Sequence, residues 1–438
     1  MIKKTCRIAR LRVLSVVAVS LLFAVSAAGQ TVKKEVFANI RLSGSNLLAY
    51  PNPSPNGLTP TPKGLHPFYI SHYGRHGSRY LISRSDYEKP CQTLAEADSL
   101  GKLTPLGRDV LRRIRLLRDE AAGRLGELTP LGAEQHRAIA RRMYERFPEV
   151  FSGKAVVDAR STVVIRCILS MENELQELAK LNPQLVIRHD ASQRDMDFLN
   201  HSDRGRSRRG RNSGAKEALD KFYEANVDWK SPMPRLFNDT VYVKENVDAR
   251  QLNDKLLKLA ASVQNCPSSA SITLYDLFSD NELYGYWRAG NASWYADYGH
   301  CPLNGGKQPY SQSHLLRRMI ADADSCLALD HPGATLRFGH EVCVLPLVCL
   351  MGINGYDLKT DDFDSLERKG WVNYRIFPMG SNVQLVFFRK NKADKDILLK
   401  VLLNENEATL PVKTDCTPFY RWRDVRQYLT DKLKENEE

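Results

Sequence analysis

Short apolar runs that alternate with helical patterns are the feature that most constrains the fold of this chain. The runs are rich in β-branched and aromatic residues, which are typical of buried strands. Because strands separated by helices form a sheet that helices cover, we predict an α/β fold with a mostly parallel sheet. The predicted strands cover residues 66–73, 155–157, 185–188, 334–338, 383–389 and 397–403.

The sequence Leu-Thr-Pro-Leu-Gly occurs twice, at residues 103–107 and 128–132. In each copy the Thr is placed to cap a helix, and the Pro suits the first helical turn. Two copies are too few for a repeat array. We therefore interpret them as the starts of two helices.

Residues 195–332 differ from the rest of the chain, with few strand-like runs, several helical stretches and many aromatic residues. We interpret them as a mainly helical cap inserted into an α/β core, whose two parts are residues 30–194 and 333–438. Residues 43–67 are rich in Pro, Asn, Ser and Gly. This composition predicts an extended segment over the surface.

Residues 1–29 have the pattern of a secretory signal peptide. Basic residues precede an apolar run of about 16 residues that ends in Ser-Ala-Ala-Gly, which predicts cleavage near Gln30. The alternative is an uncleaved membrane anchor, but the run is short for a membrane span. We expect a secreted or periplasmic protein with no stable membrane association after cleavage. The basic residues of this segment are Lys3, Lys4, Arg7, Arg10 and Arg12.

The chain remains basic when this segment is removed, because its formal net charge falls only from +12 to +7. Excess positive charge fits an anionic partner, although solubility alone explains it equally well. A basic cluster in the predicted cap is either a solvated loop or a field that attracts a polyanion. No stacking aromatic residue interrupts this cluster, so we expect no nucleic-acid binding. The cluster contains Arg204, Arg206, Arg208, Arg209 and Arg211.

Eight cysteines remain after Cys6 leaves with the signal segment. An oxidising compartment permits disulfides, but the spacing does not give their pairing, and no CxxC pair suggests zinc. Cys343 and Cys349 lie in an apolar stretch, where we expect them to pack in the core. The oligomeric state does not follow from the sequence.

A loop with nucleophilic and cationic side chains follows the first predicted strand: Arg75-His76-Gly77-Ser78-Arg79. Reactive groups at the end of a strand are typical of α/β enzymes. An imidazole can attack phosphorus, and two guanidinium groups can hold phosphate oxygens. We expect Gly77 to let the backbone approach a ligand. The alternative is a structural turn in which the arginines are solvated.

This loop resembles the signature of the histidine acid phosphatases, a family that includes phytases and multiple inositol polyphosphate phosphatases. Further stretches resemble that family in the same order, and the resemblance continues through residues 402–405 to Pro411. It implies a three-layer helix-sheet-helix core of phosphoglycerate-mutase-like type with an inserted mainly helical cap. The further stretches are residues 128–132 with Gln135, Ser161-Thr162 followed by Arg166-Cys167, and residues 338–341 leading into residues 345–347.

The resemblance also implies roles for individual residues. His76 would become phosphorylated, Arg75, Arg79 and Arg166 would bind the phosphate, and His340 would help to stabilise the transferring group. Preorganised cations and donors suit the charge spread over phosphate oxygens. No metal or organic cofactor is implied. Taken alone, Arg166 is equally a surface cation and His340 a strand-end histidine.

The sequence departs from the family pattern at the residue that would donate a proton to the leaving group. Most members have Asp directly after the second His, and the inositol polyphosphate phosphatase branch has His-Ala-Glu. Here the order is His340-Glu341-Val342. We predict that Glu341 is the proton donor, and that burial raises its pKa enough to keep it protonated. The alternative is that Glu341 only pairs with an arginine.

Two other histidines require an interpretation. His189 and Asp190 match the His-Asp pair literally, but they lie too early in the chain for the second histidine, so we interpret His189 at most as lining of the cleft. His72 lies four residues before His76, a spacing that does not define metal geometry on a strand. We expect His72 to be buried and hydrogen-bonded.

These features predict a secreted phosphomonoester hydrolase that acts on a small anionic substrate through a phosphohistidine. Inositol polyphosphates such as phytate are the expected substrates. One alternative is a broad-specificity acid phosphatase for sugar phosphates or nucleotides, or a mutase-like transfer. A different class is a phospholigand-binding protein that has lost turnover because its acid is displaced. The presence of two histidines and three arginines argues against such a binder, since anion binding alone needs no nucleophile.

Overall fold

The computed structural model describes residues 32–54, 57–199, 214–328 and 331–435. The predicted signal peptide, residues 1–29, and the basic cluster between residues 204 and 211 lie outside these ranges. Within them, no helix has both the length and the apolar character needed to cross a bilayer.

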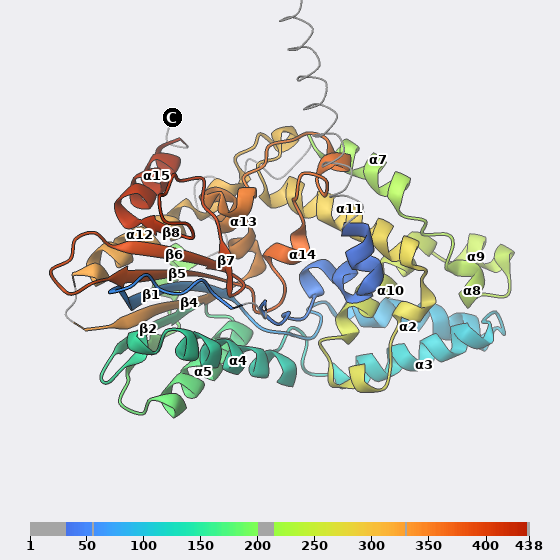
Figure 1. Ribbon diagram of the computed structural model, residues 1–438. Helices are drawn as coiled ribbons and strands as arrows, with labels where there is room; N and C mark the ends of the chain where they lie inside the picture. Colours follow the sequence, from blue (N-terminus) through green and yellow to red (C-terminus); the bar gives the residue numbers. More distant parts are fainter. Residues whose placement is uncertain (1–31, 55–56, 200–213, 329–330, 436–438) are drawn as a thin grey trace, which may run out of the picture.

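An eight-stranded mixed sheet occupies one side of the molecule, at the left of Figure 1, with the order β3-β2-β4-β1-β5-β6-β7 and β8 paired to β6. The strands from β3 to β1 run parallel, whereas those from β5 onward pair antiparallel. The strands are β1 (His66–Arg75), β2 (Val156–Ser161), β3 (Val186–Asp190), β4 (Gly333–Gly339), β5 (Asn382–Arg389), β6 (Leu398–Leu403), β7 (Asn406–Ala408) and β8 (Phe419–Arg421).

All six predicted strands are present, and the α/β class is confirmed. The prediction of a mostly parallel sheet is wrong for its second half. Residues 390–397 are all that connects β5 to β6. A parallel crossover needs a dozen or more residues, so a connection this short forces an antiparallel hairpin. The strands β7 and β8 were not predicted, because three residues are too few to show a period.

Helices cover both faces of the sheet (Figure 1), which completes the three layers. One face packs against α4 (Pro130–Arg146) and α5 (Ile165–Leu181) through a buried core that includes Phe338. The other face packs against α12 (Ser313–Leu327), α13 (Glu341–Met351) and α15 (Trp422–Lys434).

The two predicted helix starts are confirmed. The helix α3 (Pro105–Glu120) begins after Thr104, whose hydroxyl accepts a hydrogen bond from the Gly107 N–H at 3.0 Å. The helix α4 begins after Thr129, which accepts from the Gly132 N–H at 3.3 Å. Each cap satisfies an N–H group that lacks a partner within its helix.

A helical lobe lies beside the sheet, with α2 (Arg84–Ser99), α3 and α10 (Ala249–Val263) around a second buried core (Figure 1). In the described part of residues 195–332 every regular element is a helix. The lobe also contains α2 and α3, which precede residue 195, and the predicted domain boundaries stay a prediction. The other helices are α6 (Met196–Leu199), α7 (Lys216–Asn226), α8 (Met233–Leu236), α9 (Thr240–Asn246), α11 (Asp280–Tyr298) and α14 (Asn373–Ile376).

The segment predicted to run over the surface starts inside the molecule. The 3₁₀ helix η1 (Ile40–Leu47) includes its first residues, and Ser43 and Leu47 are buried. Leu47 packs in the core of the helical lobe. The expectation of a surface segment from residue 43 is therefore wrong for residues 43–47.

The eight cysteines beyond the signal segment are free thiols. Cys343 and Cys349 are fully buried in α13, which confirms their predicted packing role. Burial raises the pKa of the Cys343 thiol to about 12, so it packs as a neutral group.

Candidate active site

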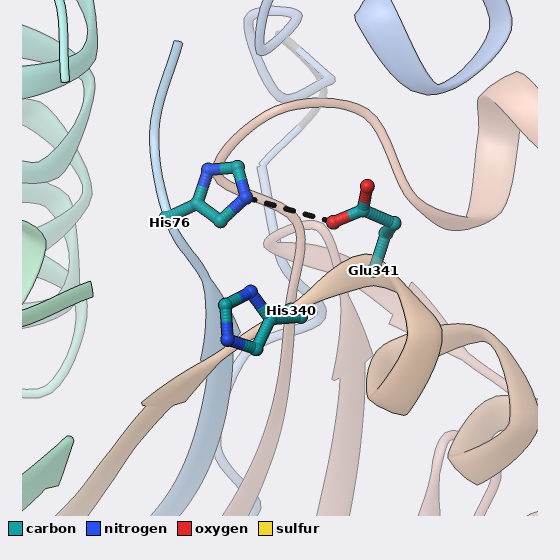
Figure 2. A group of neighbouring side chains, drawn as sticks. All are labelled: His76, His340 and Glu341. Carbon is teal, nitrogen blue, oxygen red and sulfur yellow. Dashed lines mark ion pairs between the residues drawn. The ribbon is translucent and has the colours of Figure 1, made fainter. Parts of the chain in front are cut away.

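Two neighbouring parallel strands bring the candidate residues together. Arg75, the last residue of β1, is in register with Gly339, the last residue of β4. His76 and His340 follow these positions directly, and their ring centroids lie 5.7 Å apart. Figure 2 shows the Glu341 carboxylate, at the start of α13, turned toward the His76 ring.

Hydrogen bonds fix both the backbone and the ring of His76. Its N–H donates to the Gly339 carbonyl at 3.0 Å, and its carbonyl accepts from the Gly380 N–H at 2.9 Å. The ring Nδ1 lies 2.9 Å from the Gly77 carbonyl. A carbonyl only accepts, so Nδ1 carries the proton and Nε2 presents a lone pair.

The His76 ring is fully buried, and Nε2 has no hydrogen-bond partner in the described parts of the chain. Burial lowers the pKa of His76 well below its ordinary value, and the positive charges of Arg75 and Arg166 act in the same direction. The imidazole is therefore neutral in mildly acidic solution. A neutral imidazole with a free Nε2 lone pair is the form that can attack an electrophile.

Glu341 forms an ion pair with Arg75 and also lies close to His76 and Asn46. Its Oε2 lies 3.1 Å from Arg75 Nε and 3.5 Å from His76 Nε2, and Asn46 Nδ2 donates to Oε1 at 3.4 Å. Burial raises the pKa of Glu341, but the charges of Arg75 and Arg79, together with the contact with His76, outweigh it and hold the pKa well below its ordinary value.

The expectation that burial keeps Glu341 protonated is therefore wrong for this arrangement, because the neighbouring cations outweigh desolvation. The pairing with an arginine, which was the alternative, is present. Whether Glu341 also donates a proton during a reaction depends on the charge brought in by a substrate. That role stays a prediction.

Arg75 is fully buried, and backbone carbonyls hold part of its guanidinium group. Its Nη1 donates to the carbonyls of Asn46 and Phe377, both at 2.8 Å. Its Nη2 has no hydrogen-bond partner within the described ranges. Burial, together with the charges of Arg79 and Arg166, lowers the pKa of Arg75 to about 10, so it stays charged. The Nη2 amino group of the rigidly held guanidinium is thus available to bind an anion.

Arg79 and Arg166 complete the positive group. Arg79 is nearly buried and donates from Nη1 to the Tyr80 carbonyl at 3.0 Å, whereas Arg166 is half-buried and donates to the Gly126 carbonyl at 3.4 Å. The Nε atoms of both lack a hydrogen-bond partner among the described residues. Buried donors without partners are costly unless a ligand satisfies them, so the site favours an anion.

The ring of the second histidine, His340, contacts a hydroxyl group and a thiol. Thr162 Oγ1 is 3.4 Å from His340 Nε2, and Cys167 Sγ is 3.7 Å from the same nitrogen. The His340 N–H donates to the Tyr73 hydroxyl at 3.4 Å. These contacts fix the ring beside His76, where it can donate to an oxygen of a bound anion.

Close backbone packing explains the glycine of the loop. A Cβ on Gly77 would lie 2.5 Å from the Gly132 carbonyl oxygen, and a Cβ on Gly132 would lie 2.2 Å from the Ser78 carbonyl oxygen. The predicted reason for Gly77, approach to a ligand, stays a prediction, and backbone packing is a second reason for a glycine here. The two glycines let the loop lie directly on the first turn of α4.

Side chains from two other elements hold the same loop. Gln135 Oε1 accepts from the Ser78 N–H at 2.9 Å, and Asn265 Oδ1 accepts from the Ser78 hydroxyl at 2.6 Å. Gln135 lies in the second stretch of the family resemblance, whereas nothing in the sequence pointed to Asn265 or to Asn46. Their partners are far from them in the sequence, so no local pattern reveals them.

His189 and His72 do not take part in this arrangement. His189 is exposed on the edge strand β3, where Nδ1 lies 2.8 Å from Glu172, and it does not line the cavity beside His76. His72 is buried as predicted, but neither ring nitrogen has a hydrogen-bond partner among the described residues. The predicted hydrogen bond is therefore wrong. Burial lowers the pKa of His72 to about 3, so a neutral ring avoids an uncompensated charge.

The donor atoms of His76, His340 and Glu341 lie within 4.8 Å of one another, a grouping that metal sites share. The carboxylate already pairs with Arg75 at 3.1 Å, and the charge of Arg79 acts on it as well. These cations would repel a metal ion and attract an anion. The expectation of no metal stays a prediction.

A cavity of about 790 Å³ opens beside these residues, between η1, α2, α10 and α11. Asn46 and Arg79 line it and also contribute to the group around Glu341. Its volume suits a small molecule larger than a single phosphate ion.

Comparison with known proteins gives one family and several solved structures of similar fold. The model of the histidine phosphatase superfamily (branch 2) matches residues 74–404, a range that holds all the candidate residues. No curated protein matches the chain.

Three solved structures illustrate the likeness in fold. Multiple inositol polyphosphate phosphatase from Bifidobacterium longum, in complex with inositol hexasulfate, has 17% identity and a TM-score of 0.73, covering 88% of this chain and 97% of that chain. The phytase from D. castellii has 15% identity and a TM-score of 0.65, covering 90% and 85%. The Hafnia alvei phytase in its apo form has 13% identity and a TM-score of 0.52, covering 85% and 98%.

Proposed function

The chain belongs to branch 2 of the histidine phosphatase superfamily, and from this membership we propose that it hydrolyses phosphate monoesters through a phosphohistidine at His76. One observation carries the proposal: His76 is held in the tautomer that leaves Nε2 unprotonated, and Arg75, Arg79 and Arg166 each have a donor atom without a hydrogen-bond partner among the described residues. An anion binder needs the arginines alone. A nucleophile held in its reactive tautomer among them supports phosphoryl transfer.

In the first step the phosphate of the ester binds to the free donors of Arg75, Arg79 and Arg166. The Nε2 lone pair of His76 then attacks phosphorus, and the bond from phosphorus to the ester oxygen breaks. His340 donates to a phosphoryl oxygen as charge shifts onto it. Fixed donors of this kind stabilise the transition state more than they stabilise the bound ester.

The leaving oxygen needs a proton, and Glu341 is the carboxyl group placed to give it. The bound ester brings negative charge beside Glu341, which opposes the effect of Arg75 and raises the pKa of the carboxyl group. A substrate that arrives as the monoanion passes its proton to Glu341, which passes it to the leaving oxygen. Glu341 is then a carboxylate again.

In the second step water attacks the phosphohistidine. The Glu341 carboxylate takes a proton from that water as the bond from phosphorus to Nε2 breaks. Glu341 passes this proton to the departing phosphate, which leaves as the monoanion, and His76 returns to its neutral form with Nε2 free. Each group ends the cycle in its starting state.

We further propose that inositol polyphosphates such as phytate are substrates, and that residues 1–29 direct export. Two solved structures of similar fold contain sulfated inositols: the Bifidobacterium longum enzyme with inositol hexasulfate and the Hafnia alvei phytase with myo-inositol hexakis sulphate. The cavity of about 790 Å³ beside Arg79 offers room for such a leaving group. The basic balance of the chain agrees with an anionic substrate.

The test is phosphate release from inositol hexakisphosphate and from an aryl phosphate, with a chelator present throughout. The mature protein should release phosphate, and His76→Ala should not. Acid-labile phosphoprotein should appear when the parent is quenched during turnover. Loss of activity in the chelator would indicate a metal enzyme, and no release from either ester across acid and neutral pH would favour a phosphate-binding protein.

A further inference from the structure

Asp86 is a nearly buried carboxylate in the cavity beside the phosphate-binding arginines. It lies in the first turn of α2 and is 5% exposed. Its Oδ1 is 3.0 Å from Lys255 Nζ, and its Oδ2 is 2.5 Å from Lys258 Nζ. Both lysines belong to α10 and line the same cavity. One carboxylate therefore occupies two cations that a ligand would otherwise meet.

The charges around the cavity nearly balance. The cationic side chains that line it are Arg79, Arg250, Lys255 and Lys258, and the anionic ones are Asp86, Asp248 and Asp254. Burial raises the pKa of Asp86, but the ammonium groups of Lys258 and Lys255 outweigh it and hold the pKa below its ordinary value. The carboxylate thus stays charged within the cavity.

Arg79 connects this cavity to the phosphate site, because it lines the cavity and its charge acts on Glu341. The leaving group of a bound ester would extend from the phosphate site into the cavity. A further phosphate there would have to draw the lysines away from Asp86. The carboxylate would then lie unpaired beside an anion, an arrangement that costs free energy.

We propose that Asp86 is a specificity-determining residue that makes the site favour leaving groups with few phosphates over fully phosphorylated ones. This inference rests on the proposed function, because it assumes that the cavity holds the leaving group of a phosphate ester. It assigns Asp86 a role in selection between substrates. A purely structural role, pinning α10 to α2, would affect all substrates alike.

The first test compares Asp86→Asn with the parent. The ratio of kcat/KM for inositol hexakisphosphate to kcat/KM for an aryl phosphate should rise by about five- to tenfold, since two lysines are released for the larger anion. Asp248→Asn is the matched control, because it removes an equal charge from the same cavity without an ion pair to a lysine. An equal change for both esters in Asp86→Asn, or a fall in the ratio, would overturn the proposal.

The second test needs no turnover and so separates this inference from the proposed function. Binding of inositol hexasulfate to the His76→Ala protein is measured by calorimetry. Adding Asp86→Asn should tighten binding by about five- to tenfold. Lys258→Gln, at a position whose side chain is 44% exposed, should change binding less than about twofold while Asp86 is present. A tenfold loss in Lys258→Gln would mean that the lysine already serves the ligand, which would overturn the proposal even if Asp86→Asn failed to fold.

Discussion

The Oε2 atom of Glu341 lies 3.1 Å from Nε of Arg75, which joins the candidate proton donor to a candidate phosphate-binding cation in one ion pair. The pair has a functional consequence. As long as Arg75 faces the carboxylate, Glu341 is ionised and cannot donate. In the proposed mechanism, a phosphate that engages Arg75 would weaken the pair and add negative charge, which would couple substrate binding to protonation of Glu341.

Glu341→Gln should affect esters according to their leaving groups. An alkyl ester needs a proton on its leaving oxygen, so its kcat should fall by about 10²- to 10⁴-fold. An aryl phosphate has a better leaving group, and its phosphorylation step should fall much less. Burst-phase kinetics with both esters measures the difference, with Glu217→Gln on the exposed face of α7 as control. Equal losses for both esters would remove the proton-donor role.

Arg166→Lys should lower kcat/KM by about 10-fold or more, because an ammonium group cannot reproduce the fork of a guanidinium. Arg166 is half-buried and makes one long hydrogen bond, to the Gly126 carbonyl at 3.4 Å. The melting temperature should therefore stay close to that of the parent. Full activity in this variant would show that Arg166 does not bind the phosphate.

Activity should extend into acid solution. Burial lowers the pKa of His76 well below 6.5, so the nucleophile stays neutral as the pH falls through the range in which an exposed histidine takes up a proton. The acid limb of kcat/KM should accordingly lie well below pH 6.5. A loss of activity centred near pH 6.5 would mean that His76 titrates as an exposed group.

Gly77→Ala should inactivate the protein, because the new Cβ would lie 2.5 Å from the Gly132 carbonyl oxygen and push the loop off α4. Overpacking of this kind costs about 1–3 kcal/mol of unfolding free energy. Gly290→Ala in α11 is the matched control for stability, since its Cβ would meet no atom within 4 Å. Thermal unfolding and phosphate release are measured for both. A stable, active Gly77→Ala protein would contradict the backbone packing described above.

His72 should make the fold sensitive to acid. Its pKa is about 3 in the folded chain and 6.5 when exposed, so the unfolded chain takes up a proton first as the pH falls below 6.5. The free energy of unfolding therefore falls by about 1.4 kcal/mol per pH unit as the pH decreases from 6.5 to about 3.

His72→Leu should remove this loss of stability. The difference in unfolding free energy between His72→Leu and the parent should therefore shift by about 2–3 kcal/mol in favour of the variant between pH 7.5 and pH 4.5. Urea unfolding at the two pH values measures it, with the exposed His189→Gln as control. An unchanged pH dependence in His72→Leu would show that the buried ring takes up a proton in the folded protein.

Local patterns in the sequence were enough to predict much of the fold. The apolar run before Arg75 predicted β1, and each Leu-Thr-Pro-Leu-Gly predicted a capped helix, because a strand or a cap is set by residues a few positions apart. The order of the motifs predicted which residues gather at the ends of β1 and β4. The structure places His76, His340 and Glu341 there.

Tertiary structure alone decided the charge states of the site residues and the hydrogen bonds that hold them. Arg75 contacts Glu341 and the Asn46 carbonyl only because the fold brings distant parts of the chain together. The contact with Arg75 lowers the pKa of Glu341, whereas burial alone would raise it. His72 lacks its expected hydrogen bond because the fold places no partner beside it among the described residues. A pKa and a hydrogen bond depend on which groups lie within a few ångströms in space, and sequence spacing does not give that distance.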